Sequence, residues 1–360
     1  MDENKLVNDA LKLLNECLES ISFLKISEIL TDIRNNKISA DLWVKFADPA
    51  NYPDMVVEVK NNGEPRFIRN TVNQLLRYLD YIPNAYGLII APYISKNSAE
   101  ICKEAGIGYM DLTGNCFIAF KQVYIEKEGK SGDQLEKRVL KSIYYPKAER
   151  VLRVLLNNPY KIWKIQSLSQ DADVSLGMAS KVKQRLEAME WISIEREGFK
   201  LVRWDELIKD WQEHFRYSKN EFYDLYSLKT EKYLEEQLKD FCLKNNIRWG
   251  LTMFSGASKL APYTRFKKIN AYIEKDIQKL IKALDLRSVT SGASITLIKL
   301  YDTGVFYGSE EYDGMPVVSP VQIYLDLNSN KGRGEDAAQF LYEKVIKTSW
   351  SQNMILKNGK

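Results

Sequence analysis

Two carboxylates, a lysine and a glutamine occur in an order that suits metal-assisted phosphate chemistry. Asp41 opens one apolar run, Glu58 and Lys60 close the next, and Gln74 sits in the helical pattern that follows. Strand side chains alternate between faces, so we expect Glu58 and Lys60 to share one surface while Val57 points into a core. Oxygen ligands of this kind hold Mg²⁺, which polarises a phosphate and acidifies a bound water. The pattern therefore predicts Asp41 and Glu58 as metal ligands.

The same residues have a plainer interpretation. Glu58 and Lys60 could simply decorate an exposed strand, because short strands often contain Glu-x-Lys by chance. The position of Asp41 at a strand start, and of Gln74 on the next helix with Tyr78 one turn later, favours a shared site. Lys60 would then orient the attacking water or stabilise the charge that develops on the phosphate.

The pattern around this set predicts an α/β unit over residues 1–128. Helical spacing of apolar residues alternates with short runs rich in valine and isoleucine. Predicted helices cover 5–19, 66–81 and 95–105, and predicted strands cover 38–46, 55–60, 86–93, 108–112 and 116–120. Elements in this order fit a layered α/β sandwich. A polar linker with two glycines is expected over 126–136.

Length and composition limit the number of domains and the class of protein. The 360 residues suggest two or three domains, and 45% hydrophobic with 28% charged residues is ordinary for a soluble protein. No apolar run reaches the roughly 20 residues that cross a bilayer, and the acidic start is unlike a signal peptide. Four scattered cysteines read as reduced thiols, so we expect a cytoplasmic protein without a membrane partner. His214 is the only histidine and is expected at a helix surface, which argues against histidine triads and zinc sites.

Basic charge is concentrated in the middle of the chain. The whole sequence carries +4, whereas residues 137–203 hold 14 Lys and Arg against 7 Asp and Glu, a local balance of +7. Such a concentration of positive charge indicates a surface that binds a polyanion. The segment also predicts helices over 146–157, 164–170 and 176–189 and a hairpin over 191–202. Three helices and a hairpin are the order of a winged helix-turn-helix, which we place at 137–204.

The third helix of this segment has an inward and an outward face. Ala179, Val182, Leu186 and Met189 share the inward face. Residues off that face, and on the hairpin, can reach the groove edges or phosphates of DNA. The predicted DNA contacts are Ser175, Ser180, Lys181, Lys183, Gln184, Arg185, Arg196 and Lys200. The alternative is a winged helix that binds protein, with its charge as a solvated face.

The sequence pattern changes twice in the last part of the chain. Residues 205–246 predict a helical connector, and 247–348 predict a third α/β unit with the strand-like runs NAYIEK, ASITLIKLY and VQIYLDL. No Gly-Ser pair followed by Asp-x-Asp occurs in this unit, which argues against a working nucleotidyltransferase. Gly332-Arg333-Gly334 precedes a predicted helix and either holds an anion or only caps the helix.

Residues 38–120, with MVVEVK as the Glu-x-Lys strand, resemble the PD-(D/E)XK restriction-endonuclease-like fold. The resemblance implies Mg²⁺ binding by Asp41 and Glu58, phosphate or water handling by Lys60, and a supporting role for Gln74. No proline precedes Asp41, and the family includes members that have lost cleavage.

A second resemblance is to the AbiEi-type antitoxins of type IV toxin–antitoxin systems. It is carried by LTMFSGASKLAPYTRF, VQIYLDL and GRGEDAAQFL, and upstream by YISKNSAEICKEAGIGYMDLTGN. This resemblance implies a DNA-binding repressor whose C-terminal domain is a platform for a partner or an operator.

Together these patterns predict a multi-domain α/β protein. Its parts would be a restriction-endonuclease-like α/β sandwich, a central winged helix-turn-helix and a C-terminal α/β domain that is antitoxin-type and nucleotidyltransferase-like. We expect a transcriptional regulator of a mobile-element or phage-defence system that binds double-stranded DNA, with a cognate toxin or a second copy as a further partner. The alternative is an Mg²⁺-dependent DNA endonuclease targeted by its winged helix. A third possibility is a protein-interaction scaffold whose outer units are inert.

Overall fold

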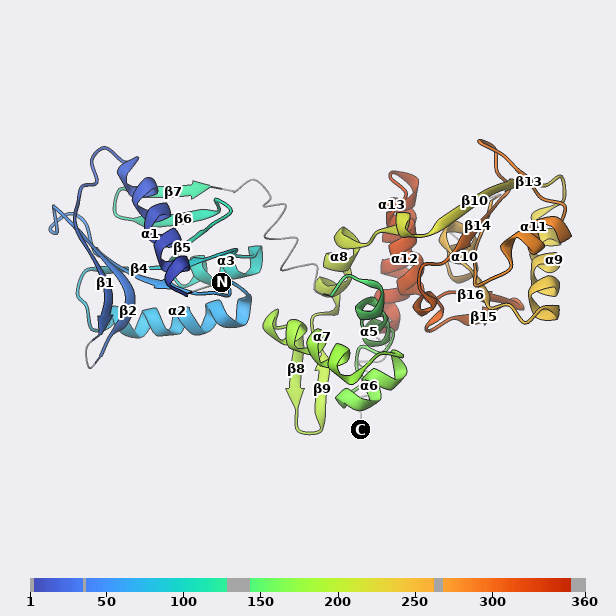
Figure 1. Cartoon of the computed structure of the whole chain (residues 1–360), viewed down its shortest axis with the longest axis horizontal. Helices are drawn as coiled ribbons and strands as arrows, with labels where there is room; N and C mark the ends of the chain where they lie inside the picture. Colours follow the sequence, from blue (N-terminus) through green and yellow to red (C-terminus); the bar gives the residue numbers. More distant parts are fainter. Residues whose placement is uncertain (1–2, 35–36, 128–142, 262–267, 351–360) are drawn as a thin grey trace. The chain divides into compact units, whose positions relative to one another are not determined.

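A computed structural model describes residues 3–34, 37–127, 143–261 and 268–350 (Figure 1). The chain divides into two compact units, Met1–Lys141 with Leu186–Glu190, and Ser142–Arg185 with Trp191–Lys360. The predicted winged helix and the predicted third α/β unit therefore fall mainly in the second unit. Most of the predicted linker over 126–136 lies outside the described residues. Within those residues, no helix has the length and hydropathy that would suit a membrane span.

A seven-stranded sheet forms the centre of the first unit, with its strands in sequence order. They are β1 (Ile26–Arg34), β2 (Ser39–Phe46), β3 (Asp54–Val59), β4 (Ala85–Ala91), β5 (Gly108–Asp111), β6 (Cys116–Phe120) and β7 (Val123–Lys127). The pairs β3–β4 and β4–β5 are parallel, and the other neighbours are antiparallel. The edge strands β1 and β7 have no predicted counterpart, because few of their side chains are buried and their apolar pattern is weak.

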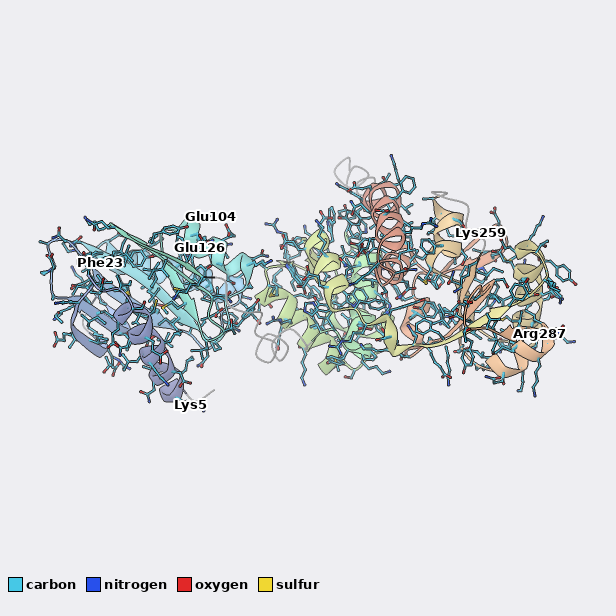
Figure 2. All side chains as sticks on the ribbon, turned by 90° about the horizontal axis from the view of Figure 1, so that it is seen from above. Lys5, Phe23, Glu104, Glu126, Lys259 and Arg287 are labelled. Carbon is cyan, nitrogen blue, oxygen red and sulfur yellow. The ribbon has the colours of Figure 1, made fainter. Side chains whose placement is uncertain are left out.

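Helices cover both faces of this sheet, as predicted. They are α1 (Glu3–Glu19) on one face, and α2 (Pro65–Leu79) and α3 (Lys96–Glu104) on the other. The interior strand β3 alternates between two cores, since Val57 joins the core under α1 and Val56 joins the core under α2. Glu58 therefore emerges on the α2 side. Figure 2 shows the side chains of this unit, including Lys5 on α1 and Glu126 on β7.

Three helices and a two-stranded hairpin open the second unit, in the predicted order. They are α5 (Pro146–Asn157), α6 (Ile165–Asp171), α7 (Leu176–Ala188), β8 (Ile192–Glu195) and β9 (Gly198–Leu201). Ser175 caps α7, because its Oγ accepts a hydrogen bond from Met178 N at 3.3 Å. Asp173 adopts a left-handed conformation, with φ of 48°, in the turn between α6 and α7. Residues 146–201 are called the winged-helix segment below.

A second seven-stranded sheet follows, with the strand order β13-β10-β14-β12-β11-β16-β15. Its strands are β10 (Glu221–Tyr226), β11 (Trp249–Leu251), β12 (Ile269–Ile273), β13 (Arg287–Ser288), β14 (Ile295–Lys299), β15 (Glu310–Tyr312) and β16 (Met315–Val317). The α-helices of this part are α8 (Trp204–His214), α9 (Glu231–Lys244), α10 (Met253–Leu260), α11 (Ile277–Ala283), α12 (Pro320–Asn328) and α13 (Arg333–Leu341). Residues 204–350 are called the C-terminal domain below.

Two predictions for this domain are wrong. Residues 221–226 form β10, which pairs with β14, so the segment 205–246 is not a purely helical connector. Only Leu225 of this strand is fully buried, and charged neighbours hide its alternation. The run VQIYLDL belongs to α12 rather than to a strand, because Ser319 caps the helix and Pro320 begins it. Every residue of the run is buried, so its sequence shows no helical period.

Buried polar side chains join the winged-helix segment to the C-terminal domain. Arg153 of α5 is fully buried, and its Nε donates to Gln322 Oε1 at 2.9 Å. Gln322 Nε2 donates to Asp326 Oδ1 at 2.7 Å, and Tyr272 Oη donates to the same oxygen at 2.9 Å. Burial raises the pKa of Asp326 to about 7. These hydrogen bonds tie α5 to α12 within the second unit.

Candidate functional site

The ends of β2 and β3 bring Asp41 next to Glu58. The antiparallel pairing of these strands places Leu42 opposite Val57. Asp41 lies one residue beyond this pair, and its Oδ2 accepts a hydrogen bond from Val59 N at 2.6 Å. A backbone N–H that would otherwise lack a strand partner is thus satisfied by a side chain, which fixes the position of the Asp41 carboxylate.

Glu58 is held between Lys60 and helix α2. Its Oε2 accepts a hydrogen bond from the Lys60 ammonium, and its Oε1 accepts one from Gln74 Nε2 at 3.0 Å. Gln74 Nε2 also donates to Tyr78 Oη at 2.7 Å, and Tyr78 donates to Ser39 O at 3.0 Å. The structure thus brings the predicted set together, while its catalytic role stays a prediction. The name carboxylate cluster is used below for Asp41, Glu58, Lys60 and Gln74.

Burial dominates the electrostatics of this cluster. Glu58 is only 1% exposed, so it does not decorate an open strand face. Burial raises the pKa of the Glu58 carboxyl, the Lys60 ammonium opposes this rise, and the charge of Asp41 adds to it. The Lys60 side chain keeps 31% of its surface exposed, and Asp41 is half-buried. Solvent therefore reaches the cluster beside Asp41 and Lys60.

The oxygen donors of the cluster fit a hard divalent cation. Mg²⁺ is usually bound by one or two carboxylates, with waters and phosphates completing its shell. Asp41 and Glu58 would supply those carboxylates, and the cation would polarise a phosphate when bound. Each Glu58 carboxylate oxygen accepts one hydrogen bond in the structure and keeps a second lone pair that a cation could use. Within the described residues, no three His, Cys, Asp or Glu side chains gather into a larger metal site.

The predicted DNA contacts differ in their exposure, while the inward face of α7 is buried as predicted. The exposed contacts are Ser175, Lys181, Gln184 and Arg196, and the half-buried contacts are Ser180, Lys183, Arg185 and Lys200. Lys183 Nζ lies 5.6 Å from the centre of the Phe199 ring, and Lys200 Nζ pairs with Glu195 at 2.8 Å. Burial lowers the pKa of Arg185, as expected for a partly desolvated guanidinium. The exposed residues are the better placed to touch DNA.

A cavity of about 470 Å³ opens beside the start of α7. Its lining includes Ser175 and Met178 at this helix, Ser169 and Gln170 on α6, and Lys147 on α5. Lys147 is exposed and was not among the predicted DNA contacts. Its position on the first helix gave no signal in the sequence, because only the fold brings it to the turn.

Two other sequence candidates have structural roles. Glu335 Oε2 accepts a hydrogen bond from Gly332 N at 3.2 Å, so a carboxylate of the chain itself occupies the helix start that was considered for an anion. His214 is half-buried rather than at the surface, and its ring stacks on Tyr144 with the ring centres 4.8 Å apart. Neither residue adds to a catalytic site.

Two solved structures are similar to parts of the chain. A repair endonuclease from Pyrococcus abyssi is 14% identical with a TM-score of 0.25, and the match covers 31% of this chain and 48% of that chain. A structure of an EndoMS complex with double-stranded DNA is 16% identical with a TM-score of 0.22, and the match covers 29% of this chain and 43% of that chain. This chain thus spans less than half the length of either structure.

A family model matches the C-terminal domain. No curated protein sequence matches the chain. Residues 200–347 match a family model described as a transcriptional regulator, the AbiEi antitoxin of a type IV toxin–antitoxin system. The range begins within β9 and runs through α13, so it includes the whole second sheet. Residues 200–347 are thus similar to the AbiEi antitoxin family of transcriptional regulators.

Proposed function

We propose that this protein is a DNA-binding transcriptional regulator of the antitoxin type. The observation that carries the proposal is the family match of residues 200–347, which share one compact unit with α5, α6 and the part of α7 up to Arg185. The match supports the regulatory role, and the winged-helix segment supplies the groups that recognition of DNA requires.

Helix α7 would enter the major groove, which admits an α-helix and displays a distinct donor and acceptor pattern for each base pair. Gln184 is exposed on this helix and has the amide that pairs with an adenine edge. Lys181 lies one turn earlier and is exposed, so it can reach a phosphate. Arg196, at the tip of the hairpin, can contact the neighbouring backbone. The +7 balance of residues 137–203 would draw this face to a polyanion.

Fluorescence anisotropy with a labelled duplex of mixed sequence, titrated with salt, tests this proposal. Each lost phosphate contact should lower the slope of log affinity against log salt by about 0.9. We expect Lys181→Ala and Arg196→Ala to flatten the slope. Gln184→Ala should leave the slope unchanged, because an amide releases no counterions. Lys12→Ala is the matched control, since this lysine is 79% exposed on α1.

An anisotropy that does not change when the chain is added to the duplex at low salt would overturn DNA binding. An unchanged slope in both Lys181→Ala and Arg196→Ala would instead remove the winged-helix segment from the interface. The family match also supports a protein partner, which we propose to be a cognate toxin or a second copy of the chain. Light scattering across a range of protein concentrations checks the second of these, and a constant monomer mass would exclude it.

We propose as a second candidate that the first unit is an Mg²⁺-dependent DNA endonuclease. The specific observation in its favour is the convergence of the carboxylate cluster from two strands and a helix. Asp41 and Glu58 would bind the cation, Lys60 would stabilise charge on the phosphate, and Gln74 would hold the Glu58 carboxylate.

Incubation of supercoiled plasmid with Mg²⁺ or Mn²⁺ tests the second candidate. Nicked or linear products should appear, and Glu58→Ala should abolish them. Glu126→Ala is the control, because this carboxylate lies on the edge strand β7 (Figure 2) and pairs with Lys103 at 2.8 Å. Plasmid that is bound but never cut would remove the endonuclease and leave the regulator standing.

A further inference from the structure

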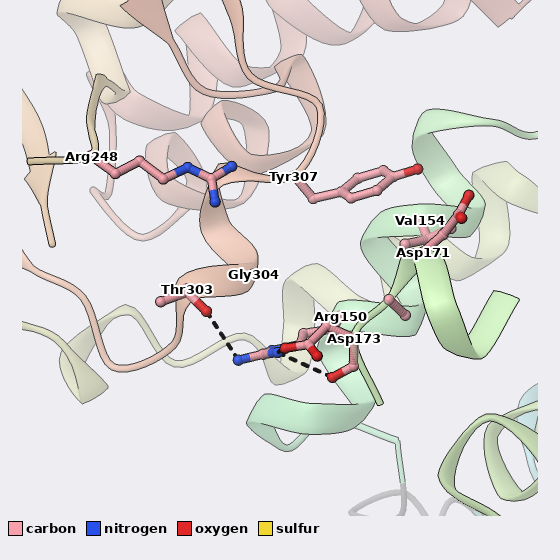
Figure 3. A pocket seen from close by; sticks show the side chains of 9 residues that line it. Arg150, Val154, Asp171, Asp173, Arg248, Thr303, Gly304 and Tyr307 are labelled. Atoms are coloured by element: carbon pink, nitrogen blue, oxygen red, sulfur yellow. Dashed lines mark hydrogen bonds and ion pairs between the residues drawn. The ribbon is translucent and has the colours of Figure 1, made fainter. Parts of the chain in front are cut away.

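Arg150 of α5 occupies the junction between the helix-turn-helix and the C-terminal domain. Its side chain is 10% exposed, and every nitrogen of the guanidinium donates a hydrogen bond. Figure 3 shows the guanidinium between Asp173 on one side and Thr303 on the other. A buried guanidinium costs free energy unless it is paired, so these partners have to stay in place.

On the DNA-binding side, Arg150 holds the turn that leads into α7. Its Nη1 donates to Asp173 O at 3.1 Å and also pairs with the Asp173 carboxylate. Asp173 has a φ of 48°, a left-handed conformation that a non-glycine residue keeps only when its surroundings support it. The Asp173 carboxylate is 86% exposed, so the bond to its carbonyl oxygen is the better-shielded contact. Arg150 thus fixes the backbone two residues before Ser175, the cap of α7.

On the other side, Arg150 binds the loop that follows β14. Its Nε donates to Asp302 Oδ1 at 2.8 Å and Oδ2 at 3.1 Å, and its Nη2 donates to Thr303 Oγ1 at 3.0 Å. Asp302 is 8% exposed, and its Oδ1 also accepts from Gly304 N at 2.8 Å. A Cβ on Gly304 would lie 2.7 Å from both Arg150 Cγ and Asp302 Oδ1. The loop can approach Arg150 this closely only because residue 304 is glycine.

Hydrogen bonds hold Asp302 and Thr303 at the start of the loop, while the buried Val305 and Phe306 hold the rest of it by packing. A cavity of about 160 Å³ lies beside the junction, and its lining includes Arg150, Asp173, Thr303 and Tyr307 (Figure 3). Side chains around a cavity lose contacts on the open side, so loss of the hydrogen bonds would leave the Asp173 turn and the start of the loop with fewer contacts.

We propose that Arg150 is a positioning residue through which Asp302 of the C-terminal domain sets the orientation of helix α7. Asp302 holds the guanidinium of Arg150, and the guanidinium in turn fixes the position of the Asp173 carbonyl. The turn that contains Asp173 then sets the direction in which α7 faces DNA. A partner that displaces the loop carrying Asp302 would therefore change DNA affinity without touching DNA. By linkage, DNA would change the affinity for that partner by the same factor. The inference rests on the proposed DNA binding.

Asp302→Ala tests the inference in the full chain, with Thr303→Ala as a milder variant and Asp240→Ala as control. Asp240 is an exposed carboxylate on α9 of the same domain. We expect Asp302→Ala to bind the mixed-sequence duplex roughly 5- to 20-fold more weakly, within the range of typical couplings. Its salt slope should match the parent, because no phosphate contact is lost. Arg150→Ala with Asp302→Ala should be no weaker than Arg150→Ala alone.

Hydrogen exchange gives a readout that does not depend on DNA. The N–H groups of Asp173 and Val174 donate to Gln170 O and Ser169 O, each at 3.0 Å, so their exchange reports on the turn. We expect faster exchange of this turn in Asp302→Ala and unchanged exchange in Asp240→Ala. Parental exchange at the turn together with parental affinity would overturn the inference. A parent that binds no duplex would overturn the DNA-binding proposal instead, and the exchange of the turn would then decide the coupling.

Discussion

Replacement of Lys60 by methionine tests how the carboxylate cluster is held together. Lys60→Met keeps the length of the side chain and removes its charge, so Glu58 Oε2 loses its ammonium partner. Gln74 Nε2 still donates to Oε1 at 3.0 Å. The variant therefore leaves a carboxylate whose side chain is 2% exposed without a counter-charge.

The size of the effect follows from burial. Removal of one partner from a fully buried pair costs about 3–5 kcal/mol. Lys60 keeps 31% exposure, so solvent already screens part of its attraction, and we expect about 2–3 kcal/mol. This cost corresponds to roughly a 30- to 150-fold rise in the opening of β3 and α2. Glu58→Gln in the Lys60→Met background should recover most of it, because no buried charge then remains.

The pH dependence of this loss has a defined sign. Burial raises the pKa of Glu58 in the folded chain above its ordinary value of 4.5. The folded state then binds more protons than the unfolded state between these two values, so stability falls as pH rises through that window. Lys60→Met removes the group that opposes the rise and widens the window. Its deficit should shrink as pH falls toward the ordinary pKa of 4.5.

Hydrogen exchange followed by mass spectrometry is the suitable assay, because it reports the opening of β3 and α2 separately from the second unit. Lys12→Met on α1 is the control for loss of an exposed lysine. Parental exchange in Lys60→Met would refute the reasoning. So would a double variant that opens as readily as Lys60→Met, since the penalty would not then come from the Glu58 charge.

Three further outcomes follow from the structure. A hydrogen bond with Cys116 lowers the pKa of Cys17, whereas burial raises the pKa of Cys102 to about 12, so peptide mass spectrometry should show Cys17 alkylated at a lower pH than Cys102. The pKa of Asp326 is raised to about 7, so the stability of the second unit should fall as pH rises from about 4 to about 7, and Asp326→Asn should flatten that trend in thermal melts. Gly304→Ala should cost about 1–3 kcal/mol in urea unfolding, because its Cβ has no space, and a parental midpoint would contradict this.

The sequence predicts the carboxylate cluster better than it predicts the elements around it. Alternation along β3 is enough to place Glu58 and Lys60 on one face, and a helical period is enough to place Gln74 and Tyr78 on one side of α2. The burial of Glu58 is not visible in the same pattern, because it depends on how α2 covers the strand.

In other parts of the chain the local sequence pattern does not separate helix from strand, or gives no signal of the contact. VQIYLDL is buried on every side in α12, so it carries no period that separates helix from strand. β10 buries only one side chain fully, so its sequence resembles a charged connector. The bonds of Arg150 to Asp302 join residues 152 positions apart, and no local pattern can signal such a pair.

The central claim is that α7 and the hairpin of the winged-helix segment bind DNA. Its most direct measurement is hydrogen exchange of the full chain with and without the mixed-sequence duplex at low salt. We predict protection in peptides that cover Leu176–Ala188 and the β8–β9 hairpin. Exchange that is identical with and without the duplex, or protection that misses both elements, would contradict the account.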